Sequence, residues 1–144
     1  MQIPLCSRAD SERLLCNSIA ESPGAPWRSV VRAIVVDDAV AGLCGLAIVR
    51  GAEEGELWYL VAPEQWGRGV ATAAARQMLD FAFGELALHR VWATCLPENP
   101  GSARVLEKAG MRQEGFLVRN VKIQGEWRDS FLYAILVDEA CAGN

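Results

Sequence analysis

The chain has 144 residues, of which 51% are hydrophobic and 22% are charged, a composition typical of globular rather than disordered proteins. Its length fits a single domain, residues 1–144, that buries about two thirds of its unfolded surface. Fourteen basic and eighteen acidic side chains give a net charge of −4, which argues against a nucleic-acid-binding surface, because such surfaces need clustered positive charge.

The sequence also argues against a membrane segment, a secretion signal and a metal site. No apolar run approaches the roughly 20 residues that a membrane span needs, and residues 1–10 lack the basic and apolar parts of a signal peptide. The five cysteines form no Cys-x-x-Cys pair, and Cys44 and Cys95 lie in apolar runs typical of a core. We therefore expect a reduced, cytoplasmic protein without a bound metal.

The first part of the chain predicts a strand, a helix and three antiparallel strands. Strands are predicted over residues 1–5, 30–36, 40–50 and 56–61. A helix is predicted between Ser7 and the proline-rich segment 22–26, because leucine and isoleucine recur there at helical spacing. Asp37 and Asp38 separate two of the strands and predict a hairpin turn. The short connections between the last three strands favour antiparallel pairing.

A change to helical spacing after residue 69 predicts a β–α–β unit over residues 56–96. Apolar side chains recur every three or four positions over residues 69–83, and Gly84 stands where such a helix is expected to end. Residues 89–96 have the composition of a buried strand. They can lie parallel to the preceding strand only if the helix crosses over between the two, which is the expected arrangement.

The last part of the chain predicts a capped helix and a second hairpin. Asn99 is a favoured N-cap residue and Pro100 suits the first helical position, so a helix is expected to begin there. Strands are predicted over residues 116–123 and 131–137, joined by a turn at residues 124–127. Residues 138–144 are expected to form a frayed tail. The predicted order is therefore β α β β β α β α β β.

Gly67 and Gly69 lie between a predicted strand and a predicted helix, and such a loop can bind an anion. Two glycines separated by one residue allow a tight turn that points N–H groups at one place, and the helix N-terminus adds partial positive charge. The loop is not a P-loop, since no Lys-Ser or Lys-Thr follows, and Thr72 stands where a dinucleotide fingerprint needs its third glycine. A coenzyme A pyrophosphate loop and a turn without a ligand both stay open.

Three parts of the sequence carry a more specific signal. The first part is segment 56–72, which contains the pattern Pro-x-x-Trp-Gly-x-Gly-x-Ala-Thr. The second part consists of segments 88–93, 99–111 and 114–115, and the third part is segment 125–129. Together they resemble the GNAT N-acetyltransferase superfamily, in its RimJ/RimL-like branch, over about residues 30–137. The resemblance implies an α/β fold with a mixed, mostly antiparallel, twisted sheet of about six or seven strands and about three flanking helices. It also implies a central β–α–β unit that binds acetyl-CoA, preceded by a shortened N-terminal region, residues 1–29.

The resemblance implies a set of residues that bind the co-substrate. These are Leu60, Val61, Gly67, Arg68, Gly69, Val70, Ala71, Thr72, Asn99 and Ser102. Main-chain N–H groups of residues 67–72 would hold the pyrophosphate, and Arg68 would pair with a phosphate. Leu60 and Val61 would pair with the pantetheine arm like an added strand, and Asn99 would bond the same arm.

The resemblance implies candidates for the catalytic acid and base, but two positions that are catalytic in other members differ here. Ser102 would protonate the departing thiolate, and Glu56 is the best remaining carboxylate to accept the proton of the amine. Leu106 and Val121 stand where other members have a tyrosine acid and a glutamate base. His89, the single histidine, begins a strand away from the expected thioester position.

The expected function is direct transfer of an acetyl group from acetyl-CoA to a primary amine, with the N-terminal amine of a protein as the first candidate. A small-molecule amine, such as a polyamine or an aminoglycoside, is an alternative acceptor. A catalytically weak, coenzyme A-binding regulatory module is an alternative function, favoured by Leu106 and Val121. The short region before residue 30 predicts an open acceptor groove and favours a homodimer. No nucleic acid or membrane partner is expected.

Overall fold

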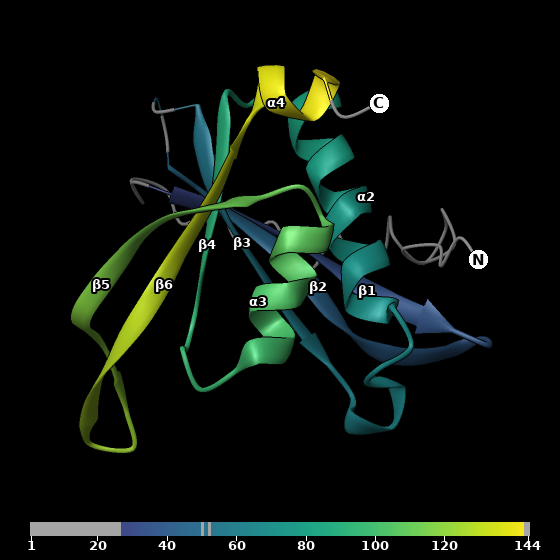
Figure 1. The fold of residues 1–144 in the computed structure, drawn as a ribbon. Coiled ribbons are helices and arrows are strands. Elements are labelled where there is room, and N and C mark those ends of the chain that lie inside the picture. Colours follow the sequence, from purple (N-terminus) through teal and green to yellow (C-terminus); the bar gives the residue numbers. More distant parts are fainter. Residues whose placement is uncertain (1–26, 50, 52, 143–144) are drawn as a thin grey trace.

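The computed structural model describes residues 27–49, 51 and 53–142. They form one six-stranded sheet in the order β1-β2-β3-β4-β6-β5, with helices packed on it (Figure 1). The strands are β1 Trp27–Val36, β2 Ala39–Val49, β3 Glu54–Val61, β4 Arg90–Cys95, β5 Arg112–Ile123 and β6 Glu126–Leu136. The helices are the 3-10 helix η1 Pro63–Gln65 and the α-helices α2 Val70–Gly84, α3 Pro100–Lys108 and α4 Val137–Ala142. The strand predicted over residues 1–5 and the helix predicted after Ser7 lie outside the described residues.

Strands β1, β2 and β3 form the predicted antiparallel meander. The β1–β2 connection is a two-residue turn in which Asp37 and Asp38 have φ angles of 50° and 63°. Both values are positive, as a type I′ hairpin turn requires, and aspartate tolerates this region better than most residues. The hairpin predicted from the two aspartates is therefore confirmed.

The β–α–β unit is also confirmed, but its two strands separate soon after they meet. β3 pairs parallel with β4 only through residues 54–56 and 90–92, although β3 continues to Val61 and β4 to Cys95. In Figure 1 the two strands diverge toward the loops that follow them. The second half of β3 therefore has a main-chain edge that no described strand covers.

Helix α2 covers the sheet and forms the centre of the core. Its sheet-facing side contains Ala74, Ala75 and Ala82, so the helix backbone lies close to the strands, and Met78 is fully buried beside them. The thiol of Cys44 in β2 lies 3.9 Å from the carbonyl oxygen of Ala74. Burial of a side chain as large as Met78 stabilises the fold by about 1.5–3 kcal/mol. Helix α3 packs on the same face of the sheet, beside α2 (Figure 1).

Several predicted element ends were wrong, and each difference has a local cause. α2 includes Gly84 and is capped by Glu85, whose N–H donates to the carbonyl of Phe81. β5 and β6 begin at Arg112 and Glu126, several residues earlier than predicted. The turn between them takes only residues 124–125, and their pairing extends back to Arg112 opposite Ala134, with register shifts after Gln113 and after Leu117.

The predicted frayed tail was also wrong, because most of it forms α4. The N–H of Val137 donates to the carbonyl of His89, just before β4, and Glu139 forms an ion pair with Arg112 in β5, so the segment is held at two points. Its acidic first turn also suits the helix dipole.

In the part of the chain that the structure describes, no helix is long and apolar enough to span a bilayer.

Candidate functional site

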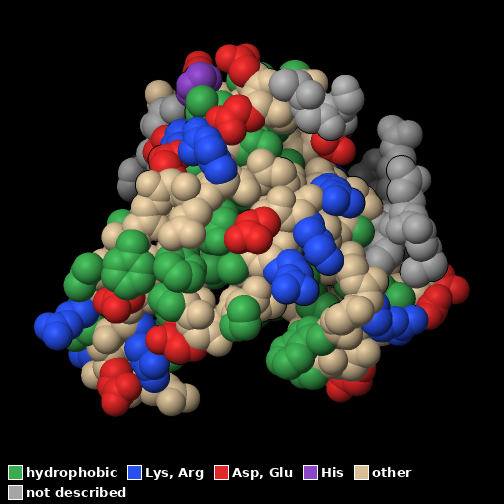
Figure 2. Space-filling view, in the orientation of Figure 1, with side chains coloured by type: hydrophobic (Ala, Val, Ile, Leu, Met, Phe, Trp, Pro, Cys, Tyr) green, Lys and Arg blue, Asp and Glu red, His purple; other side chains and the backbone are tan. Residues whose placement is uncertain are grey.

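A cavity of about 610 Å³ opens beside the uncovered edge of β3. Its walls come from the end of β3, the loop before α2, the first turn of α2 and one side of α3. Figure 2 shows the molecule hollowed at its lower edge, between the β5–β6 hairpin and that loop. The segments that the sequence singled out for ligand binding therefore meet around one hollow.

The glycine loop has the geometry of an anion site. Gly67 and Gly69 have φ angles of 74° and 76°, in the region that favours glycine, while a Cβ at either position would meet nothing within 4 Å. Backbone conformation, and not space, is therefore what requires glycine here. Gly69 is the N-cap of α2 and provides no side-chain cap, so N–H groups of the first turn, at residues 70–72, lack an intrahelical partner and border the cavity.

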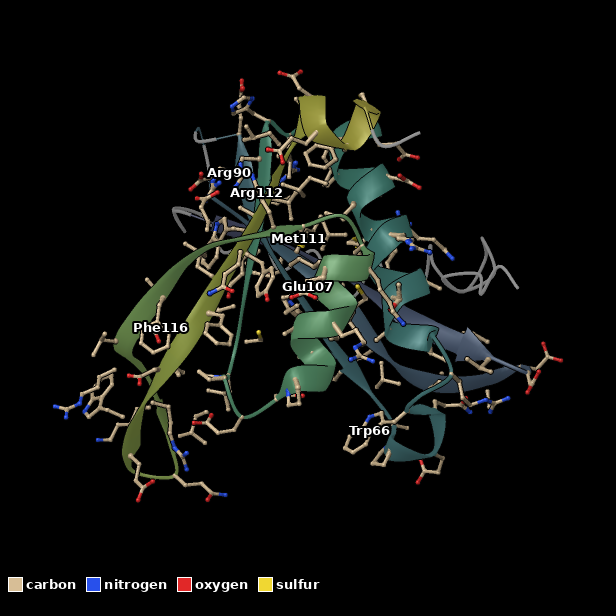
Figure 3. All side chains as sticks on the ribbon, in the orientation of Figure 1. Trp66, Arg90, Glu107, Met111, Arg112 and Phe116 are labelled. Carbon is tan, nitrogen blue, oxygen red and sulfur yellow. The ribbon has the colours of Figure 1, made fainter. Side chains whose placement is uncertain are left out.

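The loop is fastened to β3 by a side chain. The indole Nε1 of Trp66, labelled in Figure 3, donates to the carbonyl oxygen of Val61 at 2.8 Å. Trp66 is 68% exposed and borders the cavity, so its ring is available to a ligand there. Arg68, expected to pair with a phosphate, instead donates to Gln65 at 2.9 Å and does not border the cavity.

The main chain of β3 alternates between its two neighbours. The N–H of Ala62 donates to Ala41 on the β2 side, whereas the carbonyl of Glu53 accepts from His89 and Arg90 on the β4 side. Because alternate residues of a strand point their main-chain groups to opposite sides, Tyr59 and Val61 direct theirs into the gap. Val61 therefore has the orientation expected for pairing with an added strand. Leu60 borders the cavity but directs its main chain toward β2, and the alternation of the strand points its exposed side chain away from the helices.

The N-terminus of α3 forms the opposite wall. The side-chain oxygen of Asn99 accepts a hydrogen bond from the N–H of Ser102 at 3.1 Å, which confirms the predicted N-cap. The hydroxyl oxygen of Ser102 lies 2.8 Å from that of Tyr59. The Tyr59 hydroxyl is also placed to donate to the main-chain carbonyl of Ser102 at 3.2 Å.

Tyr59 is a partly buried polar residue of the cavity wall that the sequence did not predict, alongside the exposed Trp66, Arg104 and Lys108. Burial raises its pKa to about 12, against the opposing effect of the Ser102 hydrogen bond. Tyr59 therefore stays protonated at neutral pH and can act as a hydrogen-bond donor. Its position on β3, two residues after the buried Leu57, was a signal that it faces the helices. Its pairing with Ser102 joins residues 43 apart in the chain and has no local signal.

Glu56 lies at the point where β3 and β4 separate, but on the other face of the sheet. Leu57 and Tyr59 face the helices, so the alternation of the strand points Glu56 and Trp58 away from them. Among the described residues Glu56 has no hydrogen-bond or ion-pair partner, and burial raises its pKa. The structure therefore does not bring Glu56 and Ser102 together, because they lie on opposite sides of the gap.

Basic side chains gather on the outer side of α2 and α3. Arg104 and Lys108 border the cavity, and the guanidinium of Arg76 donates to the carbonyl of Lys108 at 2.8 and 3.2 Å. Figure 2 shows the Lys and Arg side chains grouped over these helices. This face is thus suited to a phosphate-rich molecule although the chain as a whole is acidic.

Other positions considered in the sequence lie away from the cavity. Leu106 is 1% exposed and belongs to the core, and Val121 lies on β5 in the hairpin. His89 is exposed and does not border the cavity. Within the described ranges, His, Cys, Asp and Glu side chains form no group of three that could hold a metal ion.

Residues 4–112 match the family of the acetyltransferase (GNAT) domain. The chain belongs to this family. Its GNAT domain is 45% identical over 102 residues to the probable N-acetyltransferase YjcK of Bacillus subtilis (69% of this chain, 56% of that protein). It is 32% identical over 101 residues to the putative ribosomal N-acetyltransferase YdaF of the same organism (67% and 55%). The chain thus spans little more than half the length of these relatives.

A solved structure supports the same fold. A spermidine N-acetyltransferase SpeG chimera from Vibrio cholerae and hSSAT superimposes on the GNAT domain with a TM-score of 0.73. The two chains are 27% identical, and the match covers 90% of this chain and 77% of that one. The predicted α/β fold, with a mostly antiparallel sheet of six strands and flanking helices, is therefore confirmed.

Proposed function

We propose that this GNAT domain moves an acetyl group from acetyl-CoA to a primary amine, as a member of the RimJ/RimL-like branch. The observation that carries the proposal is the continuity of the cavity, which joins unpaired N–H groups at a helix N-terminus to the uncovered edge of β3 and then to the hydroxyl of Ser102. A molecule with a diphosphate, an amide-containing arm and a thioester has its groups in that order.

Each part of the cavity offers the matching chemistry. Amide hydrogens of residues 67–72 suit the diphosphate, with Arg104 and Lys108 nearby as cations. The N–H of Val61 and the main chain of Tyr59 face the amides of the arm, as an exposed sheet edge faces an added strand, while the carbonyl of Val61 already accepts from Trp66. The cavity volume of about 610 Å³ lies within the range of cofactor sites.

The two catalytic candidates divide the proton transfers between the two sides of the gap. On the helix side, Ser102 donates a proton to the thiolate that leaves the thioester. On the other side, Glu56, whose pKa burial raises, accepts the proton of the attacking amine, directly or through water. A main-chain N–H of β3 stabilises the oxyanion that forms between them. The amine attacks the thioester itself, and no cysteine is acylated.

The proposed acceptor is the N-terminal amine of a polypeptide, in line with the ribosomal N-acetyltransferase name of one relative. A polyamine is the second candidate, because a spermidine N-acetyltransferase matches the fold over most of the chain. A coenzyme-binding module without catalysis is the third, because Leu106 and Val121 carry no acid or base. We also propose that the protein is cytoplasmic and acts as a homodimer.

The test is release of coenzyme A from acetyl-CoA, followed with a thiol reagent, in the presence of N-terminally free peptides, their N-acetylated counterparts or spermidine. Release with the free peptides alone supports the first acceptor, and release with spermidine alone supports the second. Acetyl-CoA binding by calorimetry without release for any acceptor supports the third. Absence of binding refutes the proposal. Native mass spectrometry measures the subunit count.

A further inference from the structure

Tyr59 and Ser102 form a pair of hydroxyl groups in the wall of the cavity. Their oxygens are 2.8 Å apart, and the Tyr59 oxygen also lies 3.2 Å from the main-chain carbonyl oxygen of Ser102. Both residues border the cavity, and Tyr59 is held from a strand while Ser102 is held by the N-cap of α3. The pair is therefore fixed from two elements and open to a ligand.

The two hydroxyl hydrogens of this pair have two arrangements. In the first, Tyr59 donates to the Ser102 carbonyl and Ser102 donates to the Tyr59 oxygen, so both hydrogens are used within the pair. In the second, Tyr59 donates to the hydroxyl oxygen of Ser102, which leaves the Ser102 hydrogen free to point into the cavity. The observed distances allow both. Exchange between them needs rotation of two O–H bonds and no movement of a heavy atom.

We infer that Tyr59 is a positioning residue for Ser102, and that its hydroxyl directs the Ser102 hydrogen toward the sulfur that leaves acetyl-CoA. This inference rests on the proposed function, which puts the thioester beside Ser102. A serine in the first turn of a helix otherwise tends to bond the nearby main chain. When the Tyr59 hydroxyl donates to the hydroxyl oxygen of Ser102, one lone pair of that oxygen is occupied. The Ser102 hydrogen is then held in a direction that points into the cavity.

Each bond and proton gained in the transfer is matched by one lost. The amine nitrogen forms a bond to the carbonyl carbon, the carbon–sulfur bond breaks, and the sulfur keeps the electron pair. The nitrogen loses its proton to Glu56 or water. The thiolate takes a proton from Ser102, which is resupplied along the hydrogen bond from Tyr59 and finally from water. The hydroxyl pair ends in its starting state.

The inference can be tested without knowledge of the acceptor, with coenzyme A alone as the probe. The quantity measured is the acid dissociation constant of the thiol of protein-bound coenzyme A. It is obtained from the far-ultraviolet absorption of the thiolate as a function of pH, after subtraction of a sample without coenzyme A. Relative to the unchanged protein, we expect this constant to fall about tenfold in Ser102→Ala and about threefold in Tyr59→Phe, because each change removes or misdirects a hydrogen bond to a charged group. The double variant is expected to match Ser102→Ala, since Tyr59 acts only through Ser102.

Tyr133→Phe is the matched control. Its hydroxyl, in β6, donates to Glu107 at 2.9 Å and does not border the cavity. Figure 3 shows Glu107 on the side of α3 that faces β4 and β6. Removal of this hydroxyl should leave the thiol constant unchanged.

The outcomes separate this inference from the proposed function. If Tyr59→Phe leaves the thiol constant unchanged, or if its effect multiplies with that of Ser102→Ala, the positioning role is overturned while the acid role of Ser102 stands. If Ser102→Ala itself has no effect, the thiol does not lie beside Ser102, and the proposed acid role falls as well.

A second measurement keeps the test valid if Tyr59→Phe does not fold. The chain has two tyrosines, so Tyr59 is the single tyrosine of the Tyr133→Phe protein. Biosynthetic replacement of tyrosine by 3-fluorotyrosine in that protein makes the hydroxyl at position 59 a stronger donor. The thiol constant should then rise, opposite to the effect of Tyr59→Phe, and an unchanged or lower constant overturns the inference.

Discussion

Substitution of Gly69 by alanine tests the loop geometry on which the proposed function depends. Gly69 has a φ of 76° and stands at the start of α2, and a Cβ there would meet nothing within 4 Å. The cost of Gly69→Ala is therefore the backbone strain of an L-residue in the left-handed region, about 1–2 kcal/mol. No steric clash adds to it.

That strain must appear either as lost stability or as lost affinity. If the loop keeps its conformation, the free energy of unfolding falls by about 1–2 kcal/mol, which for a chain of this length lowers the melting temperature by roughly 2–8 °C. If the loop relaxes instead, stability is retained, and coenzyme A binds about 5- to 30-fold more weakly because binding must restore the turn. We expect the two losses to add up to the strain energy.

Urea unfolding and calorimetric titration with coenzyme A, made on the same sample, measure both losses. Gly84→Ala is the matched control, since Gly84 ends the same helix, has no positive φ and also has open space around it. It should gain up to about 1 kcal/mol of stability and bind coenzyme A unchanged. Unaltered stability together with unaltered affinity in Gly69→Ala would refute the assignment of this loop.

Three further predictions concern stability. Tyr133→Phe should cost about 0.5–1.5 kcal/mol in urea unfolding through loss of the bond to Glu107, and no loss would show that this bond does not fasten α3 to the sheet. The guanidinium groups of Arg90 and Arg112 lower the pKa of Glu114 to about 2, so its stabilisation is complete above pH 4.5 and is lost as the pH falls toward 2. Glu114→Gln should flatten the acid limb of the stability curve and cost at most about 1 kcal/mol at pH 7, since the network is exposed; an unchanged limb contradicts this. Leu106→Ala should cost about 2–5 kcal/mol with coenzyme A affinity retained, whereas an effect on affinity alone would place Leu106 in the site and not in the core.

Many of the secondary-structure elements could be predicted from residues that are close together in the sequence. The two aspartates at 37 and 38, the N-cap at Asn99 and the helical spacing after residue 69 each predicted an element that the structure contains. Each of these signals involves residues a few positions apart, which interact in much the same way in many folds. The prediction failed at α4, because that helix is held by His89, just before β4, and by Arg112 in β5, both far away in the sequence.

The candidate site likewise has one part that the sequence predicted and other parts that it did not. The glycine loop was predictable, because a positive φ and a helix N-terminus are local features. The separation of β3 from β4, the pairing of Tyr59 with Ser102 and the position of Glu56 on the opposite face were not. They depend on how strands and helices pack, and packing is decided by the simultaneous burial of side chains from distant segments, which no short stretch of sequence specifies.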